Sequence, residues 1–536
     1  MKALSPRERV AQLLIIKSTG ELPARKTRAY REFHTLVRTL GVGGIIVNNR
    51  VNRTGAVNAN PAEMVAFLNH MQRLAKVPLL NGGDFERGAS MRVAGTVKYP
   101  HLMAFAATGD PAYSHYLGLA TAREARALGV HWVFAPDADV NNNPSNPIIN
   151  IRSYGEDPHM VAAHVRAFIE GAHSDPSSSI LVTAKHFPGH GDTAVDSHLG
   201  LPILDVDKKR LQETEFVPFR AAIAAGVDSV MTAHISMPGI DPTGVPATIS
   251  KPVITGLLRE ELGFQGLIAT DAMDMAGLNS QFAPGEAAVR ALEAGVDILL
   301  IPADPQAAVA GVMEAIQSGR LTQARVDQSV RKVLAAKVRL GLHKNRLVNP
   351  RLVPRALNLP GAAAKAQEVA DKAVALFRSR EGLLPLGSDS GACVLVLPER
   401  SGNANGVALV AAMQQRAPEV PVIVVDPAKT EEELQAVLNA STSCRTFAVA
   451  AFAQLGSYRD GAPLPGAFPF LISELIRTGK PVILASLGNP YMLREFPKVA
   501  AYFTTYSPAP TSEVAAVKAL FGDIPITGKK VVTVSQ

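Results

Sequence analysis

Short apolar runs alternate with longer segments of helical periodicity over the first 300 or so residues. Strands that are apolar on both faces, alternating with helices, are typical of a parallel sheet covered by helices on both sides. Seven or eight such units predict an α/β fold of the (β/α)8 TIM type. The apolar runs are GGIIV (43–47), VPLLNG (77–82), HWVFAP (131–136), SILVTAKHF (179–187), DSVMTAH (228–234), GLIATD (266–271) and VDILLIP (296–302), and the clearest helical segments are 61–76, 111–129 and 210–226.

A smaller alternation of the same kind follows a basic, proline-rich stretch at 341–361. We interpret that stretch as a linker and expect a helix at 362–378 behind it. The later runs predict an α/β sandwich domain. We therefore divide the chain into a (β/α)8-type catalytic domain at 1–345, a linker and connecting helix at 346–380, and an α/β sandwich domain at 381–536. The later runs are ACVLVLPE, VPVIVVDP, RTFAVAAFA, KPVILASLG and AYFTTYS.

Polar side chains stand where several of the predicted barrel strands end. Asp84 follows the second run, His186 and His234 end the fourth and fifth, and Asp271 closes the sixth, while Arg152 lies in the long loop after the third. A strand in a protein core gains nothing from ending in a charge. Because catalytic groups of such barrels come from the carboxyl ends of the strands, these residues predict an active site there.

Composition narrows the class of protein. Hydrophobic residues make up 47% and charged residues 19%, as in globular proteins. The net charge of +7, from 54 basic and 47 acidic residues, is spread along the chain, which argues against a nucleic-acid partner. Two cysteines exclude a disulfide framework and a cysteine-based zinc site.

The amino-terminal stretch MKALSPRERVAQLLII lacks the apolar core of a signal peptide, and we interpret it as an amphipathic helix. No apolar run approaches the length of a membrane span. As written, the sequence predicts a cytoplasmic protein, or a periplasmic or secreted one if an export signal has been removed.

The stretch 185-KHFPGHGDTAVDSHLGLP-202 concentrates candidate chemistry. His186 and His190 have the spacing of a zinc-binding helix, but Pro188 and the neighbouring glycines forbid a regular helix. We therefore expect no metal, and no other motif implies a cofactor. Serine catalysis is also disfavoured, because the chain holds no G-x-S-x-G elbow.

Proton transfer is the interpretation that the stretch favours. Asp196 and His198 lie two residues apart on a glycine-rich loop, so one turn can bring the carboxylate to the imidazole. Such a carboxylate raises the pKa of a histidine and fixes its tautomer, which suits a general acid near neutral pH. A solvated loop whose aspartate caps a turn is the simpler alternative.

The segment 185-KHFPGHGDTAVDSH-198 resembles the motif of bacterial β-N-acetylglucosaminidases of glycoside hydrolase family 3. The likeness extends to 134-FAPDADVNNNPSNPIINIRSYGEDP-158, which resembles the family's loop with a sugar-binding arginine. It also covers 231-MTAHISMPGID-241 and 268-IATDAMDM-275, which resemble later barrel strands. A weaker likeness at 370–386 resembles the segment that leads into the family's second domain.

The resemblance implies a role for each matching residue. Asp271 would be the nucleophile, and His198 would be the acid and base, supported by Asp196. Binding of sugar hydroxyls would fall to Lys185, His186, Arg152, Asp84 and Arg92, with His234 as a further candidate. The segment 84-DFERGASMR-92 departs from the family pattern D-x-E-G-G-R-V-x-R, because Arg87 and Ala89 interrupt the paired-glycine pattern, which puts the path of the loop to Arg92 in doubt.

The resemblance thus implies a retaining exo-β-N-acetylglucosaminidase. Its partner would be a small carbohydrate, a muropeptide or disaccharide that carries N-acetylglucosamine, from peptidoglycan turnover. A β-glucosidase or β-xylosidase of the same family is an alternative. A β-N-acetylglucosaminide phosphorylase is another, since a histidine that has given up its proton does not repel phosphate. Two further alternatives fit less well: a substrate-assisted hexosaminidase would use an Asp-Glu pair that the chain lacks, and a carbohydrate-binding protein without activity would need neither Asp271 nor His198.

Overall fold

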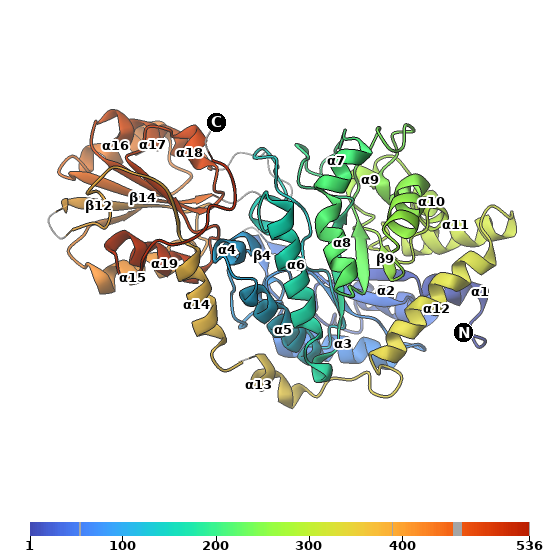
Figure 1. Cartoon of the computed structure of the whole chain (residues 1–536). Helices are drawn as coiled ribbons and strands as arrows, with labels where there is room; N and C mark the ends of the chain where they lie inside the picture. Colours follow the sequence, from blue (N-terminus) through green and yellow to red (C-terminus); the bar gives the residue numbers. More distant parts are fainter. Residues whose placement is uncertain (53–54, 358, 388–389, 454–463, 535–536) are drawn as a thin grey trace.

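The computed structural model describes the chain except for residues 53–54, 358, 388–389, 454–463 and 535–536. It consists of a barrel and a second layered unit, which lie beside each other (Figure 1). This arrangement confirms the predicted fold class of a TIM-type barrel followed by an α/β sandwich.

Eight parallel strands form the barrel in the order β10-β1-β2-β5-β6-β7-β8-β9. An isolated bridge between Ala269 and Ile298 joins the two ends of this sheet. All seven predicted runs contain or adjoin a strand, although several strands are much shorter than their runs. The bounds are β1 (Leu14–Ser18), β2 (Gly44–Val47), β5 (Gly82–Gly83), β6 (Trp132–Val133), β7 (Leu181–Phe187), β8 (Ser229–Thr232), β9 (Leu267–Ala269) and β10 (Leu299–Leu300).

Helices cover the outside of the barrel, as the alternation predicts. The segment expected as one helix at 210–226 is two, because the chain breaks at Thr214, whose φ and ψ of -127° and -76° leave the helical region. The helices are α2 (Arg28–His34), α3 (Pro61–Leu74), α4 (Leu102–Ala107), α5 (Ala112–Ala127), α6 (Pro158–His173), α7 (Lys208–Glu213), α8 (Phe216–Ala224), a π-type helix at Pro252–Glu261, α9 (Ala276–Asn279), α10 (Pro284–Ala294), α11 (Pro305–Gln317) and α12 (Gln323–Arg339).

The first strand of the barrel was not expected, and the prediction of a helix through 1–16 is wrong in its second half. Helix α1 (Pro6–Ala11) begins with a capping box between Ser5 and Glu8 and ends at Gln12. The apolar residues that follow form β1, which pairs with β2 on one side and β10 on the other. A short apolar run fits a buried helix and a buried strand equally well, so periodicity could not decide here.

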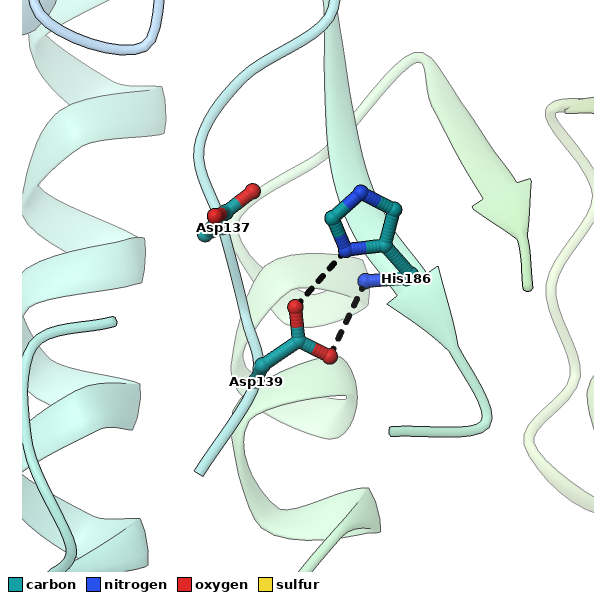
Figure 2. Close-up of side chains that lie close together, drawn as sticks. All are labelled: Asp137, Asp139 and His186. Carbon is teal, nitrogen blue, oxygen red and sulfur yellow. Dashed lines mark hydrogen bonds and ion pairs between the residues drawn. The ribbon is translucent and has the colours of Figure 1, made fainter. Parts of the chain in front are cut away.

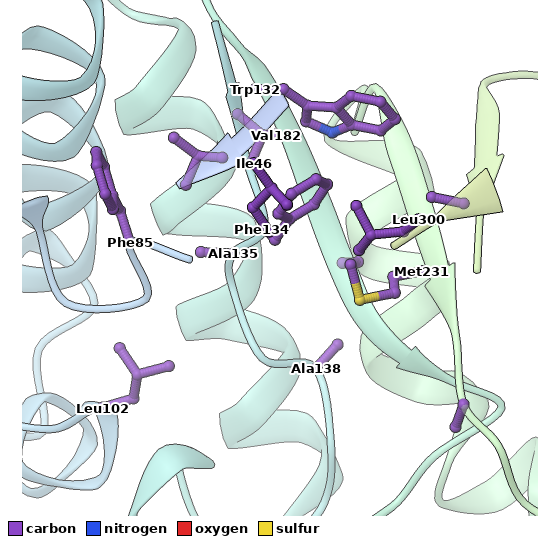
Figure 3. Close-up of a cluster of buried hydrophobic side chains, with 14 of the residues drawn as sticks. Ile46, Phe85, Leu102, Trp132, Phe134, Ala135, Ala138, Val182, Met231 and Leu300 are labelled. Carbon is purple, nitrogen blue, oxygen red and sulfur yellow. The ribbon is translucent and has the colours of Figure 1, made fainter. Parts of the chain in front are cut away.

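The barrel interior is filled with apolar side chains. Phe134 lies among Ile46, Val182, Met231 and Leu300 in Figure 3, and all are buried. Strand β5 makes room for this ring, since a Cβ atom on Gly82 would lie 2.7 Å from Phe134. The interior of the barrel is therefore a packed core with no room for a ligand between the strands, so a ligand binds at an end of the barrel.

The second unit is a six-stranded sheet in the order β11-β16-β15-β14-β12-β13, in which only β11 is antiparallel to its neighbour. The strands are β11 (Ala375–Ser379), β12 (Ala392–Leu397), β13 (Val422–Val424), β14 (Thr446–Ala453), β15 (Val482–Gly488) and β16 (Ala501–Thr504). In Figure 1, α16 (Glu431–Ala440), α17 (Phe468–Arg477) and α18 (Met492–Glu495) cover one face, with α15 (Val407–Arg416) and α19 (Pro510–Phe521) on the other.

The connection between the two units contains helix α13 (Val353–Leu357) and helix α14 (Ala362–Ala373). The helix predicted at 362–378 thus ends five residues early, because the chain turns into β11 at Ala375. The boundaries at 345 and 380 remain our proposed division of the chain.

The two cysteines do form a covalent cross-link, although they are too few for a framework of disulfides. Cys393 in β12 is bonded to Cys444, which precedes β14, and both are buried. Among the described residues, no helix has the length and apolar character needed to cross a membrane.

The second unit contacts the loops at the rim of the barrel. Ser507 Oγ lies 3.1 Å from His101 Nδ1, Tyr491 Oη accepts a hydrogen bond from Asn141 Nδ2 at 2.9 Å, and Asn489 accepts one from Asn150 at 3.4 Å. The loops that follow β15 and β16 are therefore turned toward the carboxyl ends of the barrel strands.

Candidate active site

A cavity of about 320 Å³ opens at the carboxyl ends of the barrel strands. Of the nine residues predicted for the site, seven line it: Asp84, Arg92, Arg152, Lys185, His186, His198 and Asp271. Asp196 contacts one of these seven, and His234 lies behind the wall. Residues spread over almost 190 positions of the chain are thus gathered at one rim.

Asp271 stands just beyond β9. Its Oδ1 accepts a hydrogen bond from the backbone N–H of Ala272 at 2.7 Å. Burial opposes ionisation of this carboxyl, but the positive fields of His186, His234 and His198 and the Ala272 N–H outweigh it and hold the pKa of Asp271 below its ordinary value. A carboxylate that stays ionised at neutral pH and faces the cavity is suited to act as a nucleophile.

His198 and Asp196 form the pair that the spacing predicts. Asp196 Oδ1 lies 2.7 Å from His198 Nδ1 and also accepts the backbone N–H of His198 at 2.9 Å. The Asp196 side chain is 2% exposed, whereas that of His198 is 23% exposed and lines the cavity. Because Asp196 holds Nδ1, the second ring nitrogen, Nε2, is the atom suited to exchange a proton with a substrate.

Asp84 and Arg92 are joined in spite of the altered sequence between them. A turn of 3-10 helix at Ala89–Met91 brings Arg92 Nη2 to 2.9 Å from Asp84 Oδ2. Lys185 Nζ lies 3.3 Å from the other oxygen of Asp84. Gly88 has a φ of +82°, so the single glycine that remains in the segment makes the turn.

Arg152 is held by two carboxylates that the sequence reasoning did not single out. Glu86 binds it through two hydrogen bonds, of 2.7 Å to Nη2 and 3.2 Å to Nε, and Asp137 Oδ2 lies 3.3 Å from Nε. Lys185 Nζ is 2.8 Å from Glu86 as well. Burial alone would lower the pKa of Arg152 and of Lys185, but these carboxylates outweigh it and raise both pKa values, so both side chains stay charged.

A second histidine–carboxylate pair lies in the same cavity. Figure 2 shows Asp139 beneath His186, with its Oδ2 at 2.8 Å from Nδ1 and its Oδ1 accepting the backbone N–H at 3.2 Å. Burial lowers the pKa of His186, but Asp139 outweighs it and raises the pKa above the ordinary value. A protonated His186 supplies part of the positive field that keeps Asp271 ionised.

Asp137, Asp139 and His186 are also the one group among the described residues whose donor atoms lie close enough together to hold a metal ion. The surroundings do not suit a cation, because Arg152 Nε lies 3.3 Å and Lys185 Nζ 3.9 Å from Asp137. Burial raises the pKa of Asp137 to about 7. The side-chain cations already balance this cluster.

His234 is buried behind the cavity wall. Its Nδ1 lies 2.8 Å from Thr248 Oγ1, and its Nε2 lies 2.9 Å from the carbonyl oxygen of Ala272. It therefore fixes the backbone beside Asp271 and is not among the residues that line the cavity, and its part in binding sugar stays a prediction. His190 likewise orders the loop, through Thr193 Oγ1 at 2.7 Å and Ser197 Oγ at 3.0 Å.

The site thus combines an ionised carboxylate, an imidazole backed by a carboxylate, and a dense set of charged hydrogen-bonding groups. Together these groups can carry out an acid- and base-assisted displacement on a substrate with many hydroxyl groups. The model of the amino-terminal domain of glycosyl hydrolase family 3 matches residues 5–336, which span the whole barrel. The chain belongs to glycosyl hydrolase family 3.

Several relatives in this family are similar over most of the chain. A protein from Cellulomonas fimi called beta-N-acetylglucosaminidase/beta-glucosidase is 29% identical over 92% of this chain and 88% of its own length. Beta-hexosaminidase A of Pseudoalteromonas piscicida is 32% identical over 72% of this chain and 67% of its own. The structure of a family 3 beta-N-acetylglucosaminidase from Paenibacillus sp. FPU-7 is 30% identical, covers 99% of both chains and has a TM-score of 0.84.

Two sets of site residues escaped prediction. Glu86 lies within the segment 84–92, and Asp137 and Asp139 lie just beyond β6 in the stretch 134–158. The alternation of acid and apolar residues after a buried strand, PDADV, could have marked the second set as facing the rim.

Proposed function

We propose that this glycoside hydrolase is a retaining exo-β-N-acetylglucosaminidase that removes terminal β-linked N-acetylglucosamine. The observation that carries the proposal is that Asp271 and the His198–Asp196 pair face one small cavity. The names of the relatives from Cellulomonas, Pseudoalteromonas and Paenibacillus support the sugar.

In the first step, a carboxylate oxygen of Asp271 attacks the anomeric carbon of the sugar. His198 gives a proton from Nε2 to the glycosidic oxygen, so that the aglycone leaves as an alcohol and a glycosyl ester of Asp271 remains. In the second step the neutral imidazole takes a proton from water, whose oxygen attacks the anomeric carbon. Asp271 is released, and the configuration of the anomeric carbon is retained.

Asp196 positions the imidazole and stabilises its charged form before the proton is given away. The charged groups around the cavity, Asp84, Arg92, Arg152, Lys185 and His186, match the many hydroxyls of a sugar ring. Met231 and Leu300 line the cavity and belong to the packed interior of the barrel. The cavity therefore ends blindly, which favours action on the terminal sugar of a chain.

The experiment that tests this proposal compares nitrophenol release from aryl β-N-acetylglucosaminide and aryl β-glucoside, with the variant Asp271→Ala as the control. We expect a strong preference for the acetamido sugar and loss of activity in the variant. A preference for the glucoside would assign the chain to the β-glucosidase or β-xylosidase alternative. Activity that survives in Asp271→Ala would contradict the covalent mechanism.

Phosphorolysis is tested in the same assay. Once His198 has lost its proton it carries no negative charge, so phosphate is not repelled from the glycosyl ester as it would be by a glutamate. Formation of N-acetylglucosamine phosphate in phosphate buffer would identify a phosphorylase. A turnover rate independent of phosphate, with free sugar as the product, identifies a hydrolase.

We further propose cell-wall fragments as the natural substrate and an oxidising compartment as the site of action. The disulfide between Cys393 and Cys444 supports export over the cytoplasm, because disulfides persist mainly outside the cytosol. Thiol labelling of the protein taken directly from cells tests this point. Two alkylated cysteines would instead support the cytoplasm.

A further inference from the structure

A second cavity, of about 620 Å³, lies at the end of the barrel opposite the active site. It is lined by His131, which precedes β6, and by Ser177 and Ser178, which precede β7. The amino-terminal ends of these strands form its floor, while residues 345–349 of the connection between the two units form one wall. Nothing in the proposed reaction uses this cavity.

The polar side of the cavity is positively charged. Three guanidinium groups line it, those of Arg123, Arg126 and Arg346, against the single carboxylate of Asp175. Asp175 is engaged, since its Oδ2 accepts a hydrogen bond from Arg123 Nε at 2.9 Å. Two guanidinium charges at the cavity therefore remain without a carboxylate among the residues that the structure describes.

Arg126 is the more deeply placed of these two. Its Nη2 donates to the carbonyl oxygen of Leu340 at 3.0 Å, while its Nη1 is buried without a hydrogen-bond partner. Arg346 Nη1 donates only to the carbonyl oxygen of Ala75, also at 3.0 Å. Both side chains are partly exposed, and the hydrogen bonds that the structure gives them go to carbonyl oxygens, which leave the positive charge unbalanced. A bound anion would balance it.

His131 adds a neutral hydrogen-bond donor to the same cavity. Its side chain is 4% exposed, and its Nδ1 accepts the backbone N–H of Asn81 at 3.3 Å. Burial and the nearby charges of Arg126 and Lys337 lower the pKa of His131 to about 3. In the neutral tautomer with Nδ1 as acceptor, the proton is on Nε2, where it can serve an oxygen ligand.

The apolar part of the lining comes from the connecting segment. Leu347, Val348, Leu352 and Leu359 line it, and Leu352 is 60% exposed. The same segment is basic, since residues 340–361 contain four lysines and arginines and no acidic residue. A ligand with a negative group and an apolar body would find both guanidinium groups and leucines in this lining.

We propose that this cavity is a second binding site, for a phosphate or carboxylate group attached to an apolar body. The guanidinium groups of Arg126 and Arg346 bind the anionic group with the imidazole of His131, and the connecting segment packs against the apolar part. A soluble amphiphilic metabolite and the headgroup region of an anionic lipid share this chemistry.

Calorimetric titration with octyl phosphate tests the proposal. Inorganic phosphate and octanol, which correspond to the two halves of this probe, are titrated separately for comparison. We expect octyl phosphate to bind more tightly than either half, with an affinity that falls as salt is raised. Arg346→Met and Arg126→Met should each weaken binding at least tenfold. The matched control is Arg355→Met, which removes an exposed arginine from the same basic segment but outside the cavity lining.

Thermal unfolding and aryl glycosidase activity of each variant show whether it is folded. If Arg126→Met is unstable, the titration of Arg346→Met, at a partly exposed position, still tests the proposal. Co-sedimentation with phosphatidylglycerol vesicles separates the two sources of the anion. Vesicle binding lost in Arg346→Met identifies a lipid headgroup, and binding of octyl phosphate without vesicle binding identifies a soluble ligand. No binding of octyl phosphate, or equal binding by Arg346→Met and Arg355→Met, would overturn the proposal.

Discussion

The substitution Asp196→Asn tests the proposed role of the histidine–carboxylate pair with little change in shape. It removes the negative charge that lies 2.7 Å from His198 Nδ1 in a side chain that is only 2% exposed. A hydrogen bond to a charged group contributes about 1.5–3 kcal/mol. If the transition state for proton transfer loses this energy, the rate constant for a substrate with a poor leaving group falls roughly 10- to 150-fold.

The leaving group shows whether the loss lies in proton donation. A dinitrophenyl glycoside needs little acid assistance in the first step, whereas a disaccharide needs full assistance. We therefore expect the variant to lose much less in kcat/KM on the dinitrophenyl glycoside than on the disaccharide. Asp192→Asn is the control, since Asp192 lies on the same loop but binds Arg210 at 3.0 Å. Equal losses for both leaving groups would refute the assignment of His198 as the acid.

Three further predictions concern the surroundings of the site and the stability of the chain. Glu86→Gln removes the carboxylate that lies nearest to both Arg152 and Lys185, so we expect kcat/KM to fall roughly 10- to 150-fold, and unchanged kinetics would contradict the network. Cys393→Ser opens a link across a sequence separation of 51, so the free energy of unfolding should fall by about 2–4 kcal/mol in denaturant titrations, and an unaltered midpoint would refute this. Burial lowers the pKa of Lys337 to about 7, so between pH 7 and about pH 10 the unfolded chain binds more protons than the folded protein, and the free energy of unfolding rises with pH. Over this range the free energy of unfolding of the wild type should increase more steeply with pH than that of Lys337→Met, and equal pH slopes would contradict the prediction.

The repeating pattern of the barrel could be predicted because each strand is a buried apolar run with helical segments on either side. The exact strand bounds could not, since β10 covers only two residues of a seven-residue run and β5, also two residues long, overlaps its run at Gly82 alone. The secondary structure of 14-LIIKS-18 also depends on residues distant in sequence, because this segment is a strand through its pairing with β2 and β10.

Site residues could be predicted where their position in the sequence, at the end of an apolar strand, was sufficient to place them. Asp84 and Asp271 follow apolar strands, His186 lies near the end of β7, and all three line the cavity. Glu86 and Asp139 could not be assigned in this way, because their importance comes from Arg152, 66 residues away from Glu86, and from His186, 47 residues away from Asp139. A carboxylate in a loop has no distinguishing mark until its partner is known.

The second unit shows a similar limit. Its apolar runs predicted the sheet, but contacts such as that between Ser507 and His101, which lines the cavity, join residues 406 positions apart. Sequence periodicity describes each unit separately and says nothing of which loops meet between them.

The central claim is that Asp271 forms a covalent bond to the sugar. In the variant Asp196→Asn, a dinitrophenyl β-N-acetylglucosaminide should still react quickly in the first step, while the second step lacks efficient base assistance. The glycosyl-enzyme should then accumulate. Acid quenching followed by mass spectrometry should find one N-acetylhexosaminyl group on the peptide that contains Asp271. Sustained turnover with no adduct, or an adduct on another residue, would contradict the mechanism.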